Sequence, residues 1–155
     1  MNNAAVTPQP APGITGPVLL VVAVGAVSQA AIARTAELAA GAPVTVVGID
    51  TSGISQTGTA SRWPAQPEQI RRTVALAMSV LEDTGVMAMG HIVTGSPARA
   101  LARMARTGGA RVVILDTDGR GAGAAGLMAE LRRRMYGSGI GVLAETDRRG
   151  GWVSV

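Results

Sequence analysis

The chain of 155 residues contains no cysteine, no lysine and no phenylalanine. The absence of cysteine excludes disulfides, thiol nucleophiles and thiolate metal sites. The absence of lysine excludes a Schiff base and the lysine of a P-loop. Only two tryptophans and one tyrosine are aromatic, so the core must be built from aliphatic side chains.

Groups suited to catalysis are also scarce. The single histidine, His91, falls in the middle of an expected strand, away from the strand ends where ligands bind in α/β folds. Candidate serine nucleophiles therefore have no recognisable general base. Asp116 and Asp118 could be paired carboxylates or Mg²⁺ ligands, but without a third acid nearby a capping or solvated role is the simpler interpretation. We expect neither enzymatic activity nor a metal site.

Long apolar runs are missing as well, and the longest, residues 18–24, is too short to span a membrane. The proline-rich residues 1–16 predict a disordered tail. All fourteen basic residues are arginine, and the net charge is only +4. The arginines are not interleaved with aromatic residues, so we expect no nucleic-acid binding. Residues 99, 103 and 106, and residues 132–134, could bind anions or form solvated helix faces.

Strand and helix patterns alternate along residues 17–145. Buried β-branched runs predict strands at residues 18–24, 44–49, 86–93, 112–115 and 140–144. Helical spacing with capping residues predicts helices after Ser28, from Pro67 to Gly85, from Ser96-Pro97 to residue 107, and at residues 128–136. This alternation predicts a single α/β domain, a Rossmann-like three-layer sandwich with a five-stranded parallel sheet and helices on both faces. Residues 146–155 would form a C-terminal tail.

The glycine-rich segment after the fourth strand could hold a phosphate, or it could be a loop without a ligand. Ligands bind such sheets at the carboxyl ends of the strands, where backbone N–H groups at a helix N-terminus attract anions. Asp116 opens this segment. The glycines follow at positions 119, 121, 123 and 126.

The order of the elements resembles the universal stress protein family over residues 17–145. The resemblance is carried by Val93-Thr94-Gly95-Ser96-Pro97 and by Val113-Ile114-Leu115 before the glycine-rich segment. It implies a cytoplasmic stress-response protein that forms a homodimer through its last strand, Ile140-Ala144. Some members of the family bind ATP, and others do not.

The ATP-binding members share a loop of Gly, two residues, Gly, nine residues, Gly, and Ser or Thr. In this chain only Gly119 matches, because Asp116 replaces the first glycine and Ala129 and Glu130 replace the last pair. Gly25 also stands where the family's first strand ends in an aspartate. The resemblance therefore implies a vestigial nucleotide site formed by Gly25, Val47, Thr94, Gly95, Asp116, Gly119, Ala129 and Glu130.

Asp116 and Glu130 would place negative charge beside a bound phosphate. At an effective dielectric constant near 20, like charges about 4 Å apart repel by roughly 4 kcal/mol. Glu130 could instead occupy the helix N-terminus in place of the phosphate. We expect a regulatory or interaction protein with weak or no nucleotide binding, no cofactor and an unknown protein partner. The alternative is a protein that binds ATP with Mg²⁺, or AMP, through a rearranged phosphate loop.

Overall fold

The computed structural model describes residues 15–22, 27–50, 67–94, 97–116, 122–145 and 152–154. Strands and helices alternate from the first strand to the fifth, as the sequence predicted, and a sixth strand follows. The elements are β1 Val18–Val22, α1 Gln29–Ala39, β2 Val44–Asp50, α2 Pro67–Asp83, β3 Ala88–Thr94, α3 Pro97–Thr107, β4 Val112–Asp116, α4 Ala122–Met135, β5 Gly141–Glu145 and β6 Trp152–Ser154.

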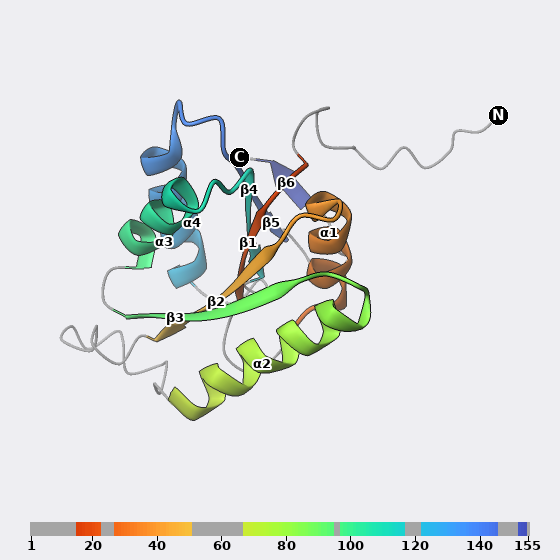
Figure 1. Cartoon of the computed structure of the whole chain (residues 1–155). Coiled ribbons are helices and arrows are strands. Elements are labelled where there is room, and N and C mark those ends of the chain that lie inside the picture. Colours follow the sequence, from red (N-terminus) through yellow and green to blue (C-terminus); the bar gives the residue numbers. More distant parts are fainter. Residues whose placement is uncertain are drawn as a thin grey trace.

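The six strands form one sheet in the order β3-β2-β1-β4-β5-β6 (Figure 1). The first five are parallel, which confirms the predicted five-stranded parallel sheet. In this register Val18 of β1 lies between Val44 of β2 and Val112 of β4. The chain builds outward from β1 in one direction through β2 and β3, and in the other through β4 and β5. The strand order therefore reverses between β1 and β4, and the carboxyl ends of these two strands are where ligands of such sheets bind.

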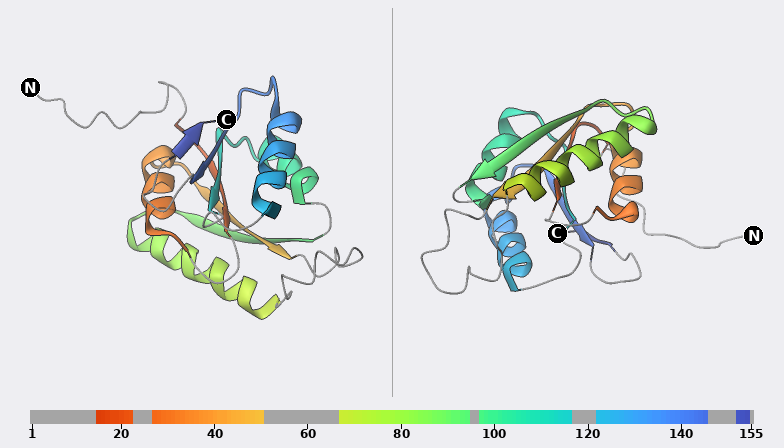
Figure 2. Two further views of the ribbon diagram at one scale, coloured as in Figure 1. Left: turned by 180° about the vertical axis from the view of Figure 1, so that it is seen from behind. Right: turned by 90° about the horizontal axis from the view of Figure 1, so that it is seen from below.

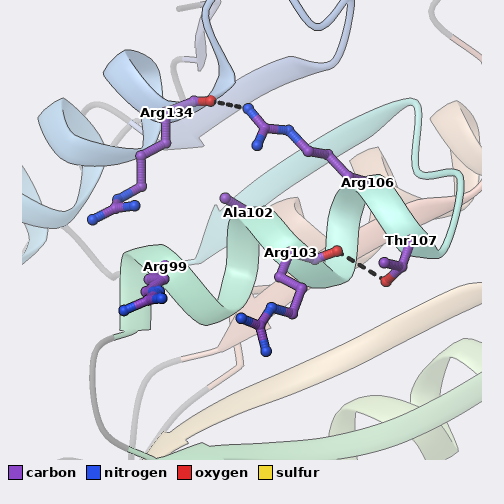
Figure 3. A pocket seen from close by; sticks show the side chains of 6 residues that line it. All are labelled: Arg99, Ala102, Arg103, Arg106, Thr107 and Arg134. Atoms are coloured by element: carbon purple, nitrogen blue, oxygen red, sulfur yellow. Dashed lines mark hydrogen bonds between the residues drawn. The ribbon is translucent and has the colours of Figure 1, made fainter.

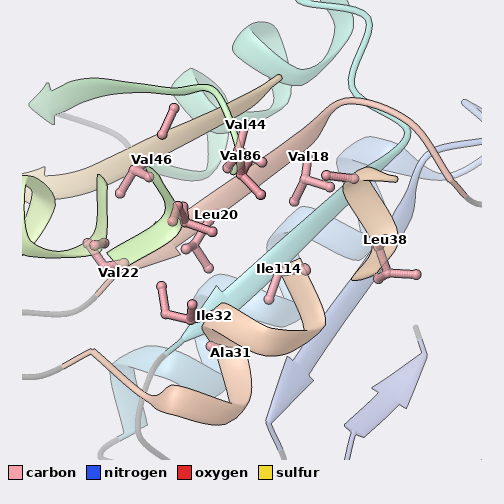
Figure 4. Close-up of a cluster of buried hydrophobic side chains, with 14 of the residues drawn as sticks. Val18, Leu20, Val22, Ala31, Ile32, Leu38, Val44, Val46, Val86 and Ile114 are labelled. Carbon is pink, nitrogen blue, oxygen red and sulfur yellow. The ribbon is translucent and has the colours of Figure 1, made fainter. Parts of the chain in front are cut away.

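Two helices cover each face of the sheet (Figures 1 and 2). Helices α1 and α2 pack on one face, where Leu20 and Ile114 lie in the buried cluster of Figure 4. Helices α3 and α4 pack on the other, where Leu19 and Leu115 are buried. Alternate residues of the central strands thus enter two separate cores, which explains why these strands are apolar without interruption.

Helix α2 lies close to the sheet because the strands beneath it carry glycines. A Cβ atom on Gly48 of β2 would lie 2.5 Å from Cγ2 of Ile70 and 2.8 Å from Cγ2 of Val74. A Cβ atom on Gly90 of β3 would lie 2.6 Å from Sδ of Met78. The two glycines therefore set the distance between α2 and β2–β3.

Helix starts with a local sequence signal are where the sequence placed them. Ser28 caps α1, since its Oγ accepts a hydrogen bond from the N–H of Ala31 at 3.2 Å, and α2 begins at Pro67. The prediction that the last helix begins near residue 128 is wrong, because α4 begins at Ala122. Leu131 and Met135 are buried against the sheet, and this packing outweighs the low helix propensity of Gly123 and Gly126.

Part of the predicted C-terminal tail is a strand. Residues Trp152–Ser154 form β6, which pairs antiparallel with β5 and places Ser154 opposite Leu143. The segment Ile140–Ala144 is therefore not the exposed sheet edge that the sequence suggested. Trp152 and Val153 are of the aromatic and β-branched types that are enriched in strands, which is consistent with a strand at this end of the chain.

The predicted N-terminal tail, residues 1–16, lies outside the described residues except for its last two. The N–H of Gly16 donates a hydrogen bond to the carbonyl of Leu38 at 3.0 Å, so the last residue of the predicted tail is bonded to α1 of the domain. In the described part of the chain, no helix combines the length and apolar character needed to cross a membrane.

Candidate functional site

The carboxylate of Asp116 stands at the point where the strand order reverses. Asp116 is the last residue of β4 and lies opposite Val22, the last residue of β1. Its side chain is buried, with only 1% of its surface exposed. Its Oδ2 accepts a hydrogen bond from the backbone N–H of Ser28 at 2.8 Å. Asp116 therefore ties the end of β4 to the N-cap of α1.

This contact gives a backbone N–H at the start of α1 a carboxyl acceptor supplied by the protein itself. Helix N-termini attract anions because their backbone N–H groups have no partner within the helix and the helix dipole is positive there. A phosphate that approached the ends of β1 and β4 would meet the Asp116 carboxylate. The sequence suggested that the carboxyl group of Glu130 could take the place of a phosphate at a helix N-terminus. In the structure it is Asp116 that lies at such a position, at the start of α1.

Glu130 does not lie at a helix N-terminus, so that prediction is wrong. It lies in the second half of α4, where its Oε2 is 3.4 Å from Nε of Arg134 and its Oε1 is 3.6 Å from Nη2 of Arg133. Ala129, the other residue at the end of the proposed motif, is an exposed helical residue beside it. Because α4 begins at Ala122, only residues 117–121 separate it from β4. The nine-residue spacing of the motif therefore ends inside the helix rather than at its start.

The remaining predicted site residues are dispersed. Val47 lies in β2 with none of its surface exposed, packed in the core under α3 and α4, so its side chain is not open to a ligand. Thr94 is exposed at the carboxyl end of β3, opposite Asp50 of β2. His91 is exposed in the middle of β3, away from the strand ends, as the sequence predicted. The predicted site residues Gly25, Gly95 and Gly119 lie outside the described residues.

The described segments contain no group of three or more His, Asp or Glu side chains that could hold a metal ion. Asp118, which the sequence paired with Asp116 as a possible Mg²⁺ ligand, lies outside them.

A second feature, an arginine groove on the α3–α4 side, was only partly visible in the sequence. It is a surface pocket of about 510 Å³ with the nearly buried Ala102 as its apolar floor. Its lining is Arg99, Ala102, Arg103, Arg106, Thr107 and Arg134 (Figure 3). The helical spacing of residues 99, 103 and 106 identified one wall. The contribution of α4 could not be foreseen, because it depends on how the two helices pack.

Comparisons with known proteins place this architecture. No protein-family model matches the sequence, and no curated protein matches it significantly. Solved structures do match it. A universal stress protein family member from Burkholderia pseudomallei aligns with a TM-score of 0.57 at 21% identity, covering 85% of this chain and 96% of that one.

The chain has the universal stress protein fold. Two further structures with this fold were solved with nucleotides. The universal stress protein from Archaeoglobus fulgidus in complex with dAMP aligns with a TM-score of 0.54 at 17% identity, covering 76% of this chain and 90% of that one. A family protein from Arabidopsis thaliana with AMP bound aligns with a TM-score of 0.55 at 14% identity, covering 86% and 94%. These identities establish the fold and leave nucleotide binding by this chain to be argued from its own residues.

Proposed function

We propose that the chain is a member of the universal stress protein family that works through its surfaces, with weak or no nucleotide binding and no catalytic activity. The observation that carries this proposal is the buried carboxylate of Asp116, which is hydrogen-bonded to the N-cap of α1 at the reversal of strand order. A fixed negative charge at that position opposes a phosphate.

The start of α4 supports the same conclusion. In the ATP-binding pattern, the last glycine and hydroxyl residue follow a long loop after the fourth strand. Here the corresponding positions, Ala129 and Glu130, lie in the second half of α4, and Glu130 is engaged by Arg133 and Arg134. Neither position can present a backbone N–H to a phosphate, because the N–H groups of a helix interior are bonded within the helix.

A second candidate is an adenine-nucleotide-binding protein. Proteins with this fold were solved with dAMP and with AMP, and this chain has a reversal of strand order, where parallel α/β sheets bind ligands. Thr94, exposed at the end of β3, is available to a ligand at that edge. This candidate requires a phosphate to bind despite Asp116, which is the step that the first proposal denies.

Thermal unfolding with and without Mg²⁺-ATP separates the two candidates. A ligand that binds only the folded state stabilises it by RT ln(1 + [L]/Kd), which is about 0.4 kcal/mol when ligand equals Kd and about 4.1 kcal/mol at a thousandfold excess. For a chain of this size 1 kcal/mol shifts Tm by about 2–4 °C. The first proposal therefore predicts a shift of at most about 2 °C at about 1 mM ATP. A shift above about 8 °C that inorganic tripolyphosphate at the same concentration does not reproduce would support the second.

We also propose a homodimer, as the family resemblance implies, but with a restriction. Pairing along the whole segment Ile140–Ala144 needs a free edge on β5, and β6 already pairs with the last part of that strand, from Leu143 to Glu145. A dimer of that type forms only if β6 leaves β5.

A further inference from the structure

The positive charge of this protein is concentrated on one side of the sheet. Helices α3 and α4 together carry six arginines and one glutamate, a net charge of +5. Helices α1 and α2 carry three arginines and four acidic residues, a net charge of −1. The whole chain has a net charge of only +4, so the α3–α4 layer dominates its field.

Helix α3 is electrostatically unfavourable by itself. It contains no acidic residue, and Arg99, Arg103 and Arg106 follow one another at spacings of four and three, which places them on one side. Like charges at these spacings destabilise a helix. Arg99 also stands in the first turn of α3, where the helix dipole disfavours a cation. Within the described part of the chain, neither Arg99 nor Arg103 has an ion-pair partner.

Helix α4 contributes Arg134 to the lining of the groove and is hydrogen-bonded to α3 there. The guanidinium of Arg106 reaches across and donates a hydrogen bond to the backbone carbonyl of Arg134, in the last turn of α4 (Figure 3). The guanidinium of Arg106 therefore already has a partner. That of Arg134 also has one, since its Nε lies 3.4 Å from Oε2 of Glu130. Arg99 and Arg103 lie one to two turns back along α3, with guanidinium groups available to a ligand.

We propose that the arginine groove binds a small polyphosphate anion, of the size and charge of a triphosphate. Arginine presents a planar fork of donors that matches phosphate oxygens in pairs, and charge-assisted hydrogen bonds of this kind are the strong ones. A bound anion relieves the repulsion along α3 and supplies the negative charge that its first turn lacks. The groove is lined by residues of α3 and by Arg134 of α4. Asp116, at the end of β4, is not part of its lining.

The test is calorimetric titration with sodium tripolyphosphate, which carries the phosphates without a base. The wild type should bind one equivalent. The variant R99Q/R103Q should bind at least about tenfold more weakly, which corresponds to about 1.4 kcal/mol. The matched control is R71Q/R72Q, which removes the same charge from exposed positions of α2 on the opposite face and should stay within about twofold of the wild type. Glutamine and arginine have similar helix propensities, so both variants should fold.

Two further titrations identify the source of the phosphates. If ATP binds the groove through its triphosphate, its affinity should match that of tripolyphosphate and fall equally in R99Q/R103Q. Equal weakening in R99Q/R103Q and R71Q/R72Q would overturn the proposal, because it would reflect net charge alone. Binding of a short DNA duplex more tightly than tripolyphosphate, lost in R99Q/R103Q, would also overturn it and assign the surface to nucleic acid. The comparison of R99Q/R103Q with the wild type is specific for the groove, because Asp116 at the strand end is not among the residues that line it.

Discussion

Removal of the Asp116 side chain tests whether this residue holds the strand end and α1 together. In Asp116→Ala the hydrogen bond from Ser28 N–H at 2.8 Å is lost, and the donor is left without this partner. A hydrogen bond to a charged group contributes about 1.5–3 kcal/mol, and a buried donor left unsatisfied adds to the loss. We expect the free energy of unfolding to fall by about 2–4 kcal/mol.

Asp116→Asn is the matched variant, because asparagine keeps the volume of the side chain and an amide oxygen that can accept from Ser28 N–H. It removes the negative charge, and with it the charge-assisted part of the contact, and it replaces the second carboxyl oxygen by an NH2 group. We expect a loss of about 1 kcal/mol, the typical net value of a neutral hydrogen bond. The order wild type, Asn, Ala is therefore the signature of a carboxylate that acts as an acceptor.

Urea unfolding followed by circular dichroism measures these differences, provided that the slope of free energy against urea is the same in all three proteins. If Asp116→Ala unfolded within about 0.5 kcal/mol of the wild type, the carboxylate would not be a structural tie. If Asn were as costly as Ala, the charge itself and not the acceptor geometry would be responsible.

Two further predictions concern the sheet. Gly48→Ala should destabilise the fold by about 1–3 kcal/mol, since the new methyl meets the stiff side chains of Ile70 and Val74. Gly90→Ala should cost less, because it meets Val74 at 2.9 Å but its nearest neighbour is the flexible Met78 rather than a second stiff side chain; equal losses in urea unfolding would contradict this account of how α2 packs. A chain that ends at Glu145 lacks β6 and exposes the edge of β5, so light scattering should show a larger particle than for the intact chain. Equal masses would show that β6 does not protect that edge.

The elements that could be predicted are those with local signals. Ser28 and Pro67 mark helix starts through capping and a fixed backbone angle, and the strands of the sheet are apolar enough to be recognised alone. The start of α4 could not be predicted, because Gly123 and Gly126 are poor helix formers and the helix is stabilised by packing of Leu131 and Met135.

The candidate sites depend on contacts between distant residues, which explains why the sequence revealed so little of them. Asp116 and Ser28 are separated by 88 positions, and Arg106 and Arg134 by 28. The sequence singled out Asp116 as an acidic residue where the motif has glycine, and the α3 arginines as either an anion-binding surface or a solvated helix face. Their partners follow only from the packing of α1 against β4 and of α3 against α4.

The measurement that tests the central claim most directly is the affinity of the wild-type protein for Mg²⁺-ATP, determined by calorimetry at about 0.15 M salt, where exposed charges are largely screened. Because the buried carboxyl group of Asp116 already occupies the strand end where we propose that a phosphate is opposed, the account predicts a Kd of about 1 mM or weaker, a binding free energy of only about −4 kcal/mol. Binding that tripolyphosphate reproduces and that R99Q/R103Q loses belongs to the arginine groove and leaves this claim intact. Micromolar binding that requires the adenosine would contradict it and show that the strand-end site works despite Asp116.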